Sequence, residues 1–197
     1  MTLSMATISE ALNFALQHHL NGRLGEAEAI CRQILQIQPH HPEALHLLGL
    51  IAHQVGRHQI AADCIAQAIR ANPTIPDFYN NLGLVQQAQG KRAEAQAAYR
   101  QALSLKPDLA EAHNNLGIIY KEKGNLDKAV EHYQLVVSLN PGMEEARNNL
   151  GVIHYLRGNP RAAELEYEKV LKINPDNLVG RINLGIVYKA QKLERKA

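Results

Sequence analysis

Tryptophan is absent from this chain of 197 residues, and phenylalanine occurs only twice, so a core built on large aromatic side chains is excluded. Hydrophobic residues nevertheless make up 46% of the sequence, which is enough apolar surface to fold and argues against intrinsic disorder. Any core must therefore be largely aliphatic and rich in alanine.

Strong charge of either sign is also missing. The formal net charge is +2, and no long run of like charges occurs. A nucleic-acid-binding domain usually carries a clear basic stripe, so we expect no nucleic-acid partner. The N-terminus lacks the basic and apolar regions of a signal peptide, and no apolar stretch approaches the roughly 18–20 residues that span a bilayer. We therefore expect no membrane insertion and a cytoplasmic location.

Residues arranged for chemistry are lacking as well. Cys31 and Cys64 are too few for a disulfide framework, and we expect both to be small buried residues. No nucleophile motif and no phosphate-binding glycine loop occurs. His19, His46 and His53 could in principle share a metal, but no carboxylate or thiol completes a recognised spacing. The sequence thus predicts no catalytic residue, no metal site and no cofactor.

What the sequence does contain is a repeat. Five series of residues each recur at a constant step of 34 positions. The series are Pro39, Pro73, Pro107, Pro141 and Pro175; Gly49, Gly83, Gly117, Gly151 and Gly185; Gly22, Gly56, Gly90, Gly124 and Gly158; Ala27, Ala61, Ala95, Ala129, Ala163 and Ala197; and Leu48, Leu82, Leu116, Leu150 and Leu184, with Phe14 in the first repeat. Chance does not hold five series in one register.

This step, with Leu-Gly-x-x-Tyr, then Ala-x-x-x-aromatic, then Pro, resembles the tetratricopeptide repeat family over essentially the whole chain. Leu116, Tyr120, Ala129, Tyr133 and Pro141 show the pattern best. The resemblance divides the chain into a tail (1–7), five repeats (8–41, 42–75, 76–109, 110–143 and 144–177) and a partial sixth repeat (178–197).

The resemblance implies an all-α fold, a right-handed superhelix (an α-solenoid) of about five and a half helix-turn-helix repeats. We expect the glycines of the Gly83 series to let paired helices approach, and those of the Gly90 series to end a helix at positive φ. Proline at the end of each repeat cannot continue a helix. Repeat 1 departs from the pattern, with Ala15 for glycine and Cys31 for the aromatic. Thr7-Ile8-Ser9-Glu10 predicts a capping box at the first helix.

In this family a concave groove is lined by positions 2, 5, 6, 9, 12 and 13 of each repeat. Position 6 is asparagine in five of the six repeats here, and position 5 adds three more asparagines. Asparagine is a poor helix former, so its recurrence at one phase needs a reason. The predicted peptide-binding residues on the concave face are Asn13, Asn80, Asn81, Leu84, Asn114, Asn115, Ile118, Lys121, Asn148, Asn149, Val152, Tyr155 and Asn183.

The asparagine ladder resembles the tetratricopeptide region of the protein O-linked N-acetylglucosamine transferase family and its Spindly-type relatives. That resemblance implies amides that hold the backbone of an extended polypeptide, since an amide both donates and accepts hydrogen bonds. It covers the repeats only, and no glycosyltransferase domain is present. The alternative is that the amides bond neighbouring repeats to each other and fix their stacking.

Other groove positions restrict the ligand. Position 9 is aliphatic throughout, so the Lys/Asn/Arg clamp of chaperone-binding relatives is missing. Glu43, Asp77, Glu111 and Glu145 at position 2 would repel a C-terminal carboxylate. These acids also lie where negative charge complements a helix N-terminus.

Three functions follow from the sequence. The first is a protein–protein interaction scaffold without enzyme activity, which binds an extended peptide in the groove. The second is the substrate-recruiting arm of a larger enzyme such as a glycosyltransferase. The third is a self-associating scaffold, because repeat 6 stops as its second helix begins and leaves apolar surface uncovered. That ending predicts a fragment of a longer protein, with a lone capping helix as the alternative.

Overall fold

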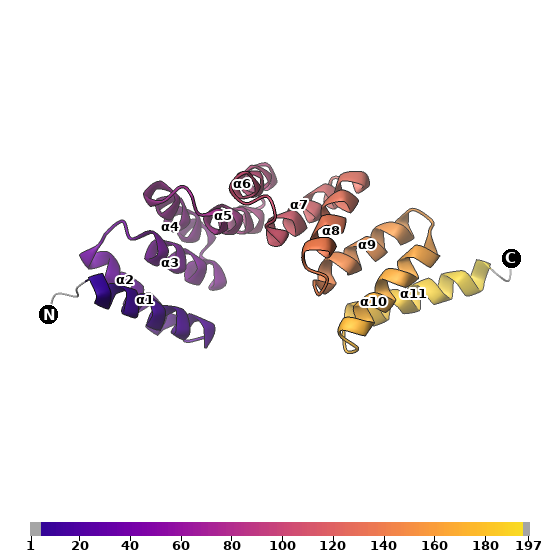
Figure 1. Cartoon of the computed structure of the whole chain (residues 1–197), viewed down its shortest axis with the longest axis horizontal. Coiled ribbons are helices and arrows are strands. Elements are labelled where there is room, and N and C mark those ends of the chain that lie inside the picture. The colour runs from indigo at the N-terminus through magenta and orange to yellow at the C-terminus, as the bar shows by residue number, and fades with distance from the viewer. Residues whose placement is uncertain (1–4, 195–197) are drawn as a thin grey trace. The chain divides into compact units, whose positions relative to one another are not determined.

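The computed structural model describes residues 5–194, and helices are the only regular secondary structure in that range (Figure 1). The all-α prediction is confirmed. The eleven helices of the described residues are α1 (Met5–Leu20), α2 (Leu24–Ile37), α3 (Pro42–Gln54), α4 (His58–Ala71), α5 (Pro76–Ala88), α6 (Arg92–Leu105), α7 (Ala110–Glu122), α8 (Leu126–Leu139), α9 (Glu144–Leu156), α10 (Pro160–Ile173) and α11 (Leu178–Glu194).

Glycine makes the turn between the two helices of each repeat. The five glycines of the Gly90 series have φ between 70° and 78°, as the sequence predicts. This left-handed region is open to glycine because it has no Cβ. In repeats 4 and 5 an asparagine follows that glycine and caps the second helix: Asn125 Oδ1 accepts from the Lys128 amide, and Asn159 Oδ1 accepts from the Ala162 amide.

Proline separates one repeat from the next. Pro107 lies two residues beyond the end of α6, and Pro141 lies two residues beyond the end of α8. Pro42 and Pro76 open α3 and α5, where a missing backbone N–H leaves no intrahelical bond unmade.

The start of α1 corrects one prediction. The helix begins at Met5, so Thr7 lies inside it, and the predicted capping box is wrong. Neither glycine nor proline occurs between Met5 and Thr7, so nothing in the local sequence stops the helix from reaching Met5. The rest of the predicted tail, residues 1–4, lies outside the described residues.

The helices form two compact units. The N-terminal unit (1–107) contains α1–α6, and the C-terminal unit (108–197) contains α7–α11. In each unit the closest packing is between the two helices of one repeat, and each second helix also packs on the first helix that follows it. First helices of successive repeats touch as well: α1 with α3 and α3 with α5 in one unit, and α9 with α11 in the other. Each unit is therefore a stack of helical hairpins.

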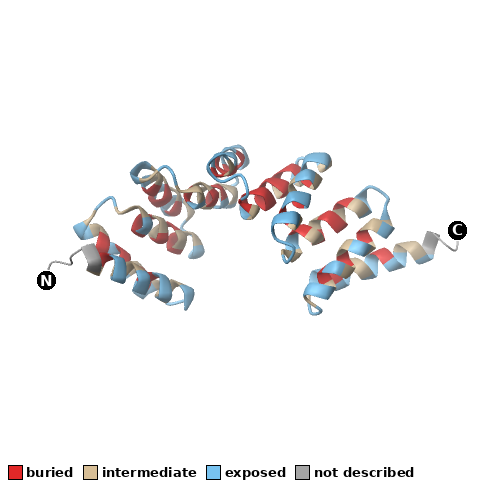
Figure 2. Ribbon diagram, in the orientation of Figure 1, coloured by how far each residue is buried: buried red, intermediate tan, exposed pale blue. Residues whose placement is uncertain are grey.

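Buried residues run along the packed stripe of each helix (Figure 2). The alanines of the Ala95 series in repeats 1–5 are completely buried, which keeps the second helix thin where it crosses the first. Tyr99, Tyr133 and Tyr167 are the largest fully or nearly fully buried side chains, and apart from Phe78 and Tyr120 the remaining core is aliphatic. The sequence predicts a largely aliphatic core, and three of its aromatics share one repeat position.

Each buried tyrosine packs on the glycine of its own repeat. A Cβ added at Gly83, Gly117 or Gly151 would lie 2.5–2.6 Å from the ring of Tyr99, Tyr133 or Tyr167, respectively. Real Cβ atoms do not approach that closely. The two helices are thus joined by an aromatic ring lying against a bare backbone.

Repeat 1 has a smaller version of the same contact. Ala15 replaces the glycine, Cys31 replaces the tyrosine, and both are completely buried in one cluster with Ala27. Repeat 2 lies in between, because Gly49 packs on Ile65. A larger residue on the first helix therefore comes with a smaller one on the second, which conserves the volume of the contact.

Gly117→Ala is expected to lower the free energy of unfolding by about 1–3 kcal/mol, since the added methyl group overpacks the contact with Tyr133. Gly185→Ala is the matched control, because it adds the same group at the same repeat position with nothing within 4 Å. That change should leave stability unchanged or raise it by up to about 1 kcal/mol through helix propensity. Urea unfolding followed by circular dichroism compares them, and equal effects would contradict the tyrosine contact.

Candidate functional site

The predicted groove residues all lie on first helices. In the N-terminal unit they are Asn13 on α1 and Asn80, Asn81 and Leu84 on α5; in the C-terminal unit they are Asn114, Asn115, Ile118 and Lys121 on α7, Asn148, Asn149, Val152 and Tyr155 on α9, and Asn183 on α11. Within the C-terminal unit, the structure brings Lys121 to Asn149 and places Asn148 and Asn149 beside the start of α11.

The asparagines at position 5 are mostly enclosed. Asn80, Asn114 and Asn148 are only 7%, 5% and 8% exposed. Asn148 Nδ2 donates to Asn177 Oδ1 at 3.5 Å, whereas the Oδ1 atoms of Asn114 and Asn148 are buried without a partner among the described residues. A buried acceptor without a donor costs about 1–3 kcal/mol, so these two atoms favour the arrival of a donor.

Two of the asparagines at position 6, Asn81 and Asn149, bridge neighbouring repeats. Asn81 Nδ2 lies 2.9 Å from His46 Nε2, and Lys121 Nζ donates to Asn149 Oδ1 at 2.5 Å. Burial lowers the pKa of His46 to about 4 despite the nearby Glu43 carboxylate, so its ring is neutral at pH 7 and can accept from the Asn81 amide. These bonds are of the stacking kind that the sequence leaves open as the alternative to ligand binding.

A polar hollow lies where α9 meets α11. Its volume is about 410 Å³, and it is lined by Glu144, Glu145, Asn148, Asn149, Asn177 and Val179. These residues occupy positions 1, 2, 5, 6 and 34 of repeat 5 and position 2 of repeat 6, so the hollow includes three of the predicted groove positions.

The N-terminal unit has a hollow at nearly the same repeat positions. It measures about 340 Å³ and is lined by Ile8, Ser9, Leu12, Gln38, His41 and Glu43. Ile8 and Leu12 stand where the other hollow has Glu144 and Asn148. The stacking of consecutive repeats thus forms a hollow at similar positions in both units. The lining side chains differ, so the two hollows differ in chemistry.

The wall of the α9–α11 hollow is fixed by hydrogen bonds. Asn177 Oδ1 accepts from the Gly180 amide at 2.7 Å and caps α11, while Asn177 Nδ2 donates to Glu144 Oε2. Asn174 Nδ2 donates to the same oxygen at 3.2 Å. Glu145 is exposed, and its carboxylate makes no hydrogen bond or ion pair with the described residues. The hollow therefore has one carboxylate that holds the structure and one that faces solvent. Asn174 and Asn177 lie in the loop between repeats, so inspection of first helices alone misses them.

Apolar side chains accompany the amides along the first helices. Leu84 and Tyr155 are 37% and 36% exposed, and Ile118 and Val152 are partly buried. They offer contact surface without charge.

Neither cysteine is suited to nucleophilic chemistry. Burial, assisted by Glu28, raises the pKa of the Cys31 thiol to about 11, and burial also raises the pKa of Cys64. The histidines pair instead of converging: His53 Nδ1 lies 3.1 Å from His58 Nδ1, and His113 Nδ1 lies 2.9 Å from His132 Nδ1. Among residues 5–194, no three His, Cys, Asp or Glu side chains gather as a metal site.

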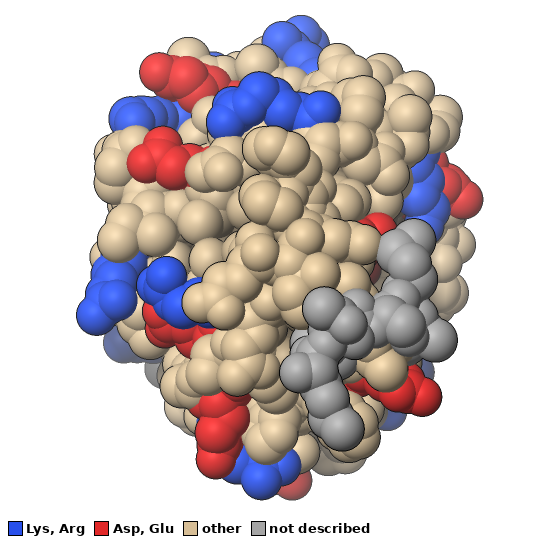
Figure 3. All heavy atoms as spheres, turned by 90° about the vertical axis from the view of Figure 1, so that its left-hand side faces the viewer, with Lys and Arg blue, Asp and Glu red and all other residues tan. Residues whose placement is uncertain are grey.

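Charges of both signs alternate on the molecular face shown in Figure 3, with uncharged surface between them. In the part of the chain that the structure describes, no helix combines the length and hydrophobicity needed to cross a membrane.

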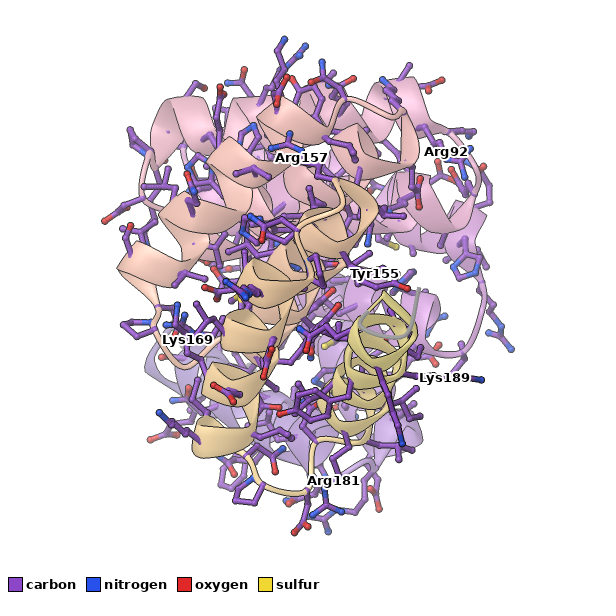
Figure 4. All side chains as sticks on the ribbon, turned by 90° about the vertical axis from the view of Figure 1, so that its right-hand side faces the viewer. Arg92, Tyr155, Arg157, Lys169, Arg181 and Lys189 are labelled. Atoms are coloured by element: carbon purple, nitrogen blue, oxygen red, sulfur yellow. The ribbon has the colours of Figure 1, made fainter. Side chains whose placement is uncertain are left out.

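The last helix has an uncovered side. Gly185 has nothing within 4 Å, whereas its equivalents in repeats 2–5 pack against a side chain of the second helix. Ile182 and Ile186 are 53% and 48% exposed on this helix. Arg181 and Lys189 project outward from it (Figure 4), and Arg181 Nη2 pairs with Asp176 Oδ1 at 3.0 Å.

Comparison with solved structures shows that the fold is shared. The crystal structure of MamA is 22% identical with a TM-score of 0.71, covering 89% of this chain and 97% of that one. YrrB, described as a TPR protein with an unusual peptide-binding site, is 24% identical with a TM-score of 0.66, covering 86% and 88%. PilF of Pseudomonas aeruginosa is 17% identical with a TM-score of 0.86, covering 94% and 84%. At these identities the likeness concerns the fold alone.

Sequence comparison identifies the repeats themselves. No curated protein gave a significant match. Residues 42–75, 80–144 and 144–177 each match a family described as tetratricopeptide repeat. These matches together span more than half of the chain, and the hairpins that they cover stack as the repeat step predicts. The chain therefore belongs to the tetratricopeptide repeat family.

Proposed function

We propose that this protein is an interaction module that binds an extended polypeptide segment along the first helices of its repeats, without catalysis, in the cytoplasm. The observation that carries the proposal is the α9–α11 hollow, where groove positions 2, 5 and 6 meet around side chains that can donate and accept hydrogen bonds. Tetratricopeptide repeat proteins generally mediate protein–protein interaction, and YrrB is described as having a peptide-binding site.

The asparagine amides are better suited to hydrogen-bond the backbone of such a segment than to recognise its particular side chains. An extended strand presents alternating N–H and C=O groups, and each asparagine can satisfy one of either kind. The apolar residues Leu84, Ile118 and Val152 add contact surface beside the amides. Asn81 and Asn149 already bond neighbouring repeats, so in this proposal they both fix the stacking and face the ligand.

Asn115→Ala combined with Asn149→Ala is expected to weaken peptide binding about thirtyfold, by the loss of two hydrogen bonds worth roughly 1 kcal/mol each. The probe is a set of peptides selected from a random displayed library on the wild-type protein, and binding is measured by fluorescence anisotropy.

The matched control is Gln101→Ala with Gln134→Ala, which removes two exposed amides from the second helices α6 and α8. Its affinity should stay within twofold of the wild type. Circular dichroism should be unchanged for both double variants. If the asparagine pair melts the helices while the glutamine pair does not, the ladder is structural and the peptide-binding role is lost.

Self-association is a second candidate function, favoured by the uncovered side of α11 around Gly185. The α11 residues Leu178, Ile182, Ile186 and Tyr188 are between 46% and 67% exposed. Exposed apolar surface of this kind marks interaction sites. The role as recruiting arm of a glycosyltransferase stays a prediction, because the matches concern the tetratricopeptide repeat alone.

Ile182→Lys with Ile186→Lys should abolish any concentration-dependent self-association, because two charges would have to be buried in the contact. Sedimentation velocity at low and high protein concentration measures this for wild type and variant. A wild-type protein that sediments as a monomer throughout would rule out the second candidate.

A further inference from the structure

We propose that the hollow between α9 and α11 receives a lysine or arginine side chain of the bound polypeptide. This inference rests on the proposed peptide-binding function and assigns it a ligand chemistry. Three groups support it: the Glu145 carboxylate, the Glu144 carboxylate and the orphaned Oδ1 of Asn148.

All three groups are acceptors. Asn148 is 8% exposed, lines the hollow and keeps an Oδ1 atom that no described donor reaches. Glu144 is held by the Asn174 and Asn177 amides, which fix its charge at the wall. Glu145 stands beside it without an ion pair to the described residues. A site with two negative charges and an unmet acceptor is complementary to a cationic group with several N–H donors.

No basic side chain of the described residues pairs with Glu145. Arg147 Nη1 lies 3.4 Å from Glu166 Oε2, and Arg181 Nη2 lies 3.0 Å from Asp176 Oδ1. Lys121 Nζ donates to Asn149 Oδ1 on the wall of the hollow and offsets part of its negative charge. The Glu145 carboxylate remains available to a ligand.

The remaining wall suits the aliphatic part of a long basic side chain. Val179 is 55% exposed at the edge of the hollow. Lysine and arginine place their methylene groups along apolar surface while the charged end reaches polar groups. A hollow of about 410 Å³ has room for such a side chain and displaced water.

The hollow in the N-terminal unit has a different chemistry. Ile8 and Leu12 replace Glu144 and Asn148 in its lining, and Glu43 Oε2 lies 3.3 Å from His41 Nδ1. Ser9 stands where the other hollow has Glu145, so this lining has one carboxylate instead of two. Among the described residues, no amide oxygen of this lining is buried without a partner. The preference for a basic side chain is thus assigned to the α9–α11 hollow, and Glu43 provides a matched control.

The test uses N-acetylated, C-amidated peptides synthesised from sequences selected on the wild-type protein. We expect lysine or arginine to be enriched at one peptide position. Replacing that arginine by citrulline, which keeps the shape but removes the charge, should weaken binding to the wild-type protein about tenfold. Glu145→Gln should weaken binding of the arginine peptide similarly, and should reduce the effect of citrulline to less than twofold.

Glu43→Gln removes the carboxylate that lines the other hollow, at the place that Val179 occupies in the α9–α11 hollow, and should change the affinity less than twofold. Peptides selected without any preference for basic residues, or equal losses in Glu145→Gln and Glu43→Gln, would overturn the assignment and leave peptide binding intact. Failure of the wild-type protein to select any peptide would overturn both proposals. The citrulline peptide tests the charge on the unmodified protein, so the result does not depend on how a variant folds.

Discussion

The contact of an aromatic ring with a bare backbone inside each repeat is the constraint on which the stack depends. Gly83, Gly117 and Gly151 bring the first helix against the ring of a tyrosine from the second. This spacing sets where the second helix lies, and within each unit that helix packs on the first helix that follows it. Since a helical hairpin cannot bury its own apolar surface, the placement of neighbours depends on the same contact.

The sequence predicts most of the fold because the constraints are local and repeated. The repeat step of 34 residues predicts three features of the fold. These are the positive φ of the Gly90 series, the prolines beyond the second helices and the buried alanines. The start of α1 does not follow, because a capping box competes with a segment of good helix-forming residues around Met5. The compensating sizes of Ala15 and Cys31 cannot be predicted from the sequence, because each residue alone is only a departure from the repeat pattern. Their relation becomes clear once the structure shows that the two side chains pack in one cluster.

The site is less predictable than the fold. Repeat numbering places the asparagines on first helices, but it cannot tell the enclosed amides of position 5 from the bridging amides of position 6. Those roles depend on partners such as His46, which occurs in one repeat, and Lys121, whose only equivalent is Lys189. The family's groove positions do not include Asn174 and Asn177, because both lie in the loop between repeats. They contribute to the hollow by donating to Glu144. Residues outside the asparagine ladder therefore decide what the ladder amides contact.

The cap of α11 couples the wall of the hollow to the first turn of that helix. Asn177 holds the first turn of α11 through the Gly180 amide and holds the wall of the hollow through Glu144. Fraying of that turn removes Val179 and Asn177 from the hollow together. A molecule seated there therefore favours the helical state of this turn by mass action and slows amide hydrogen exchange in it. Through Asn177, a change in the order of one helical turn becomes a response to a ligand.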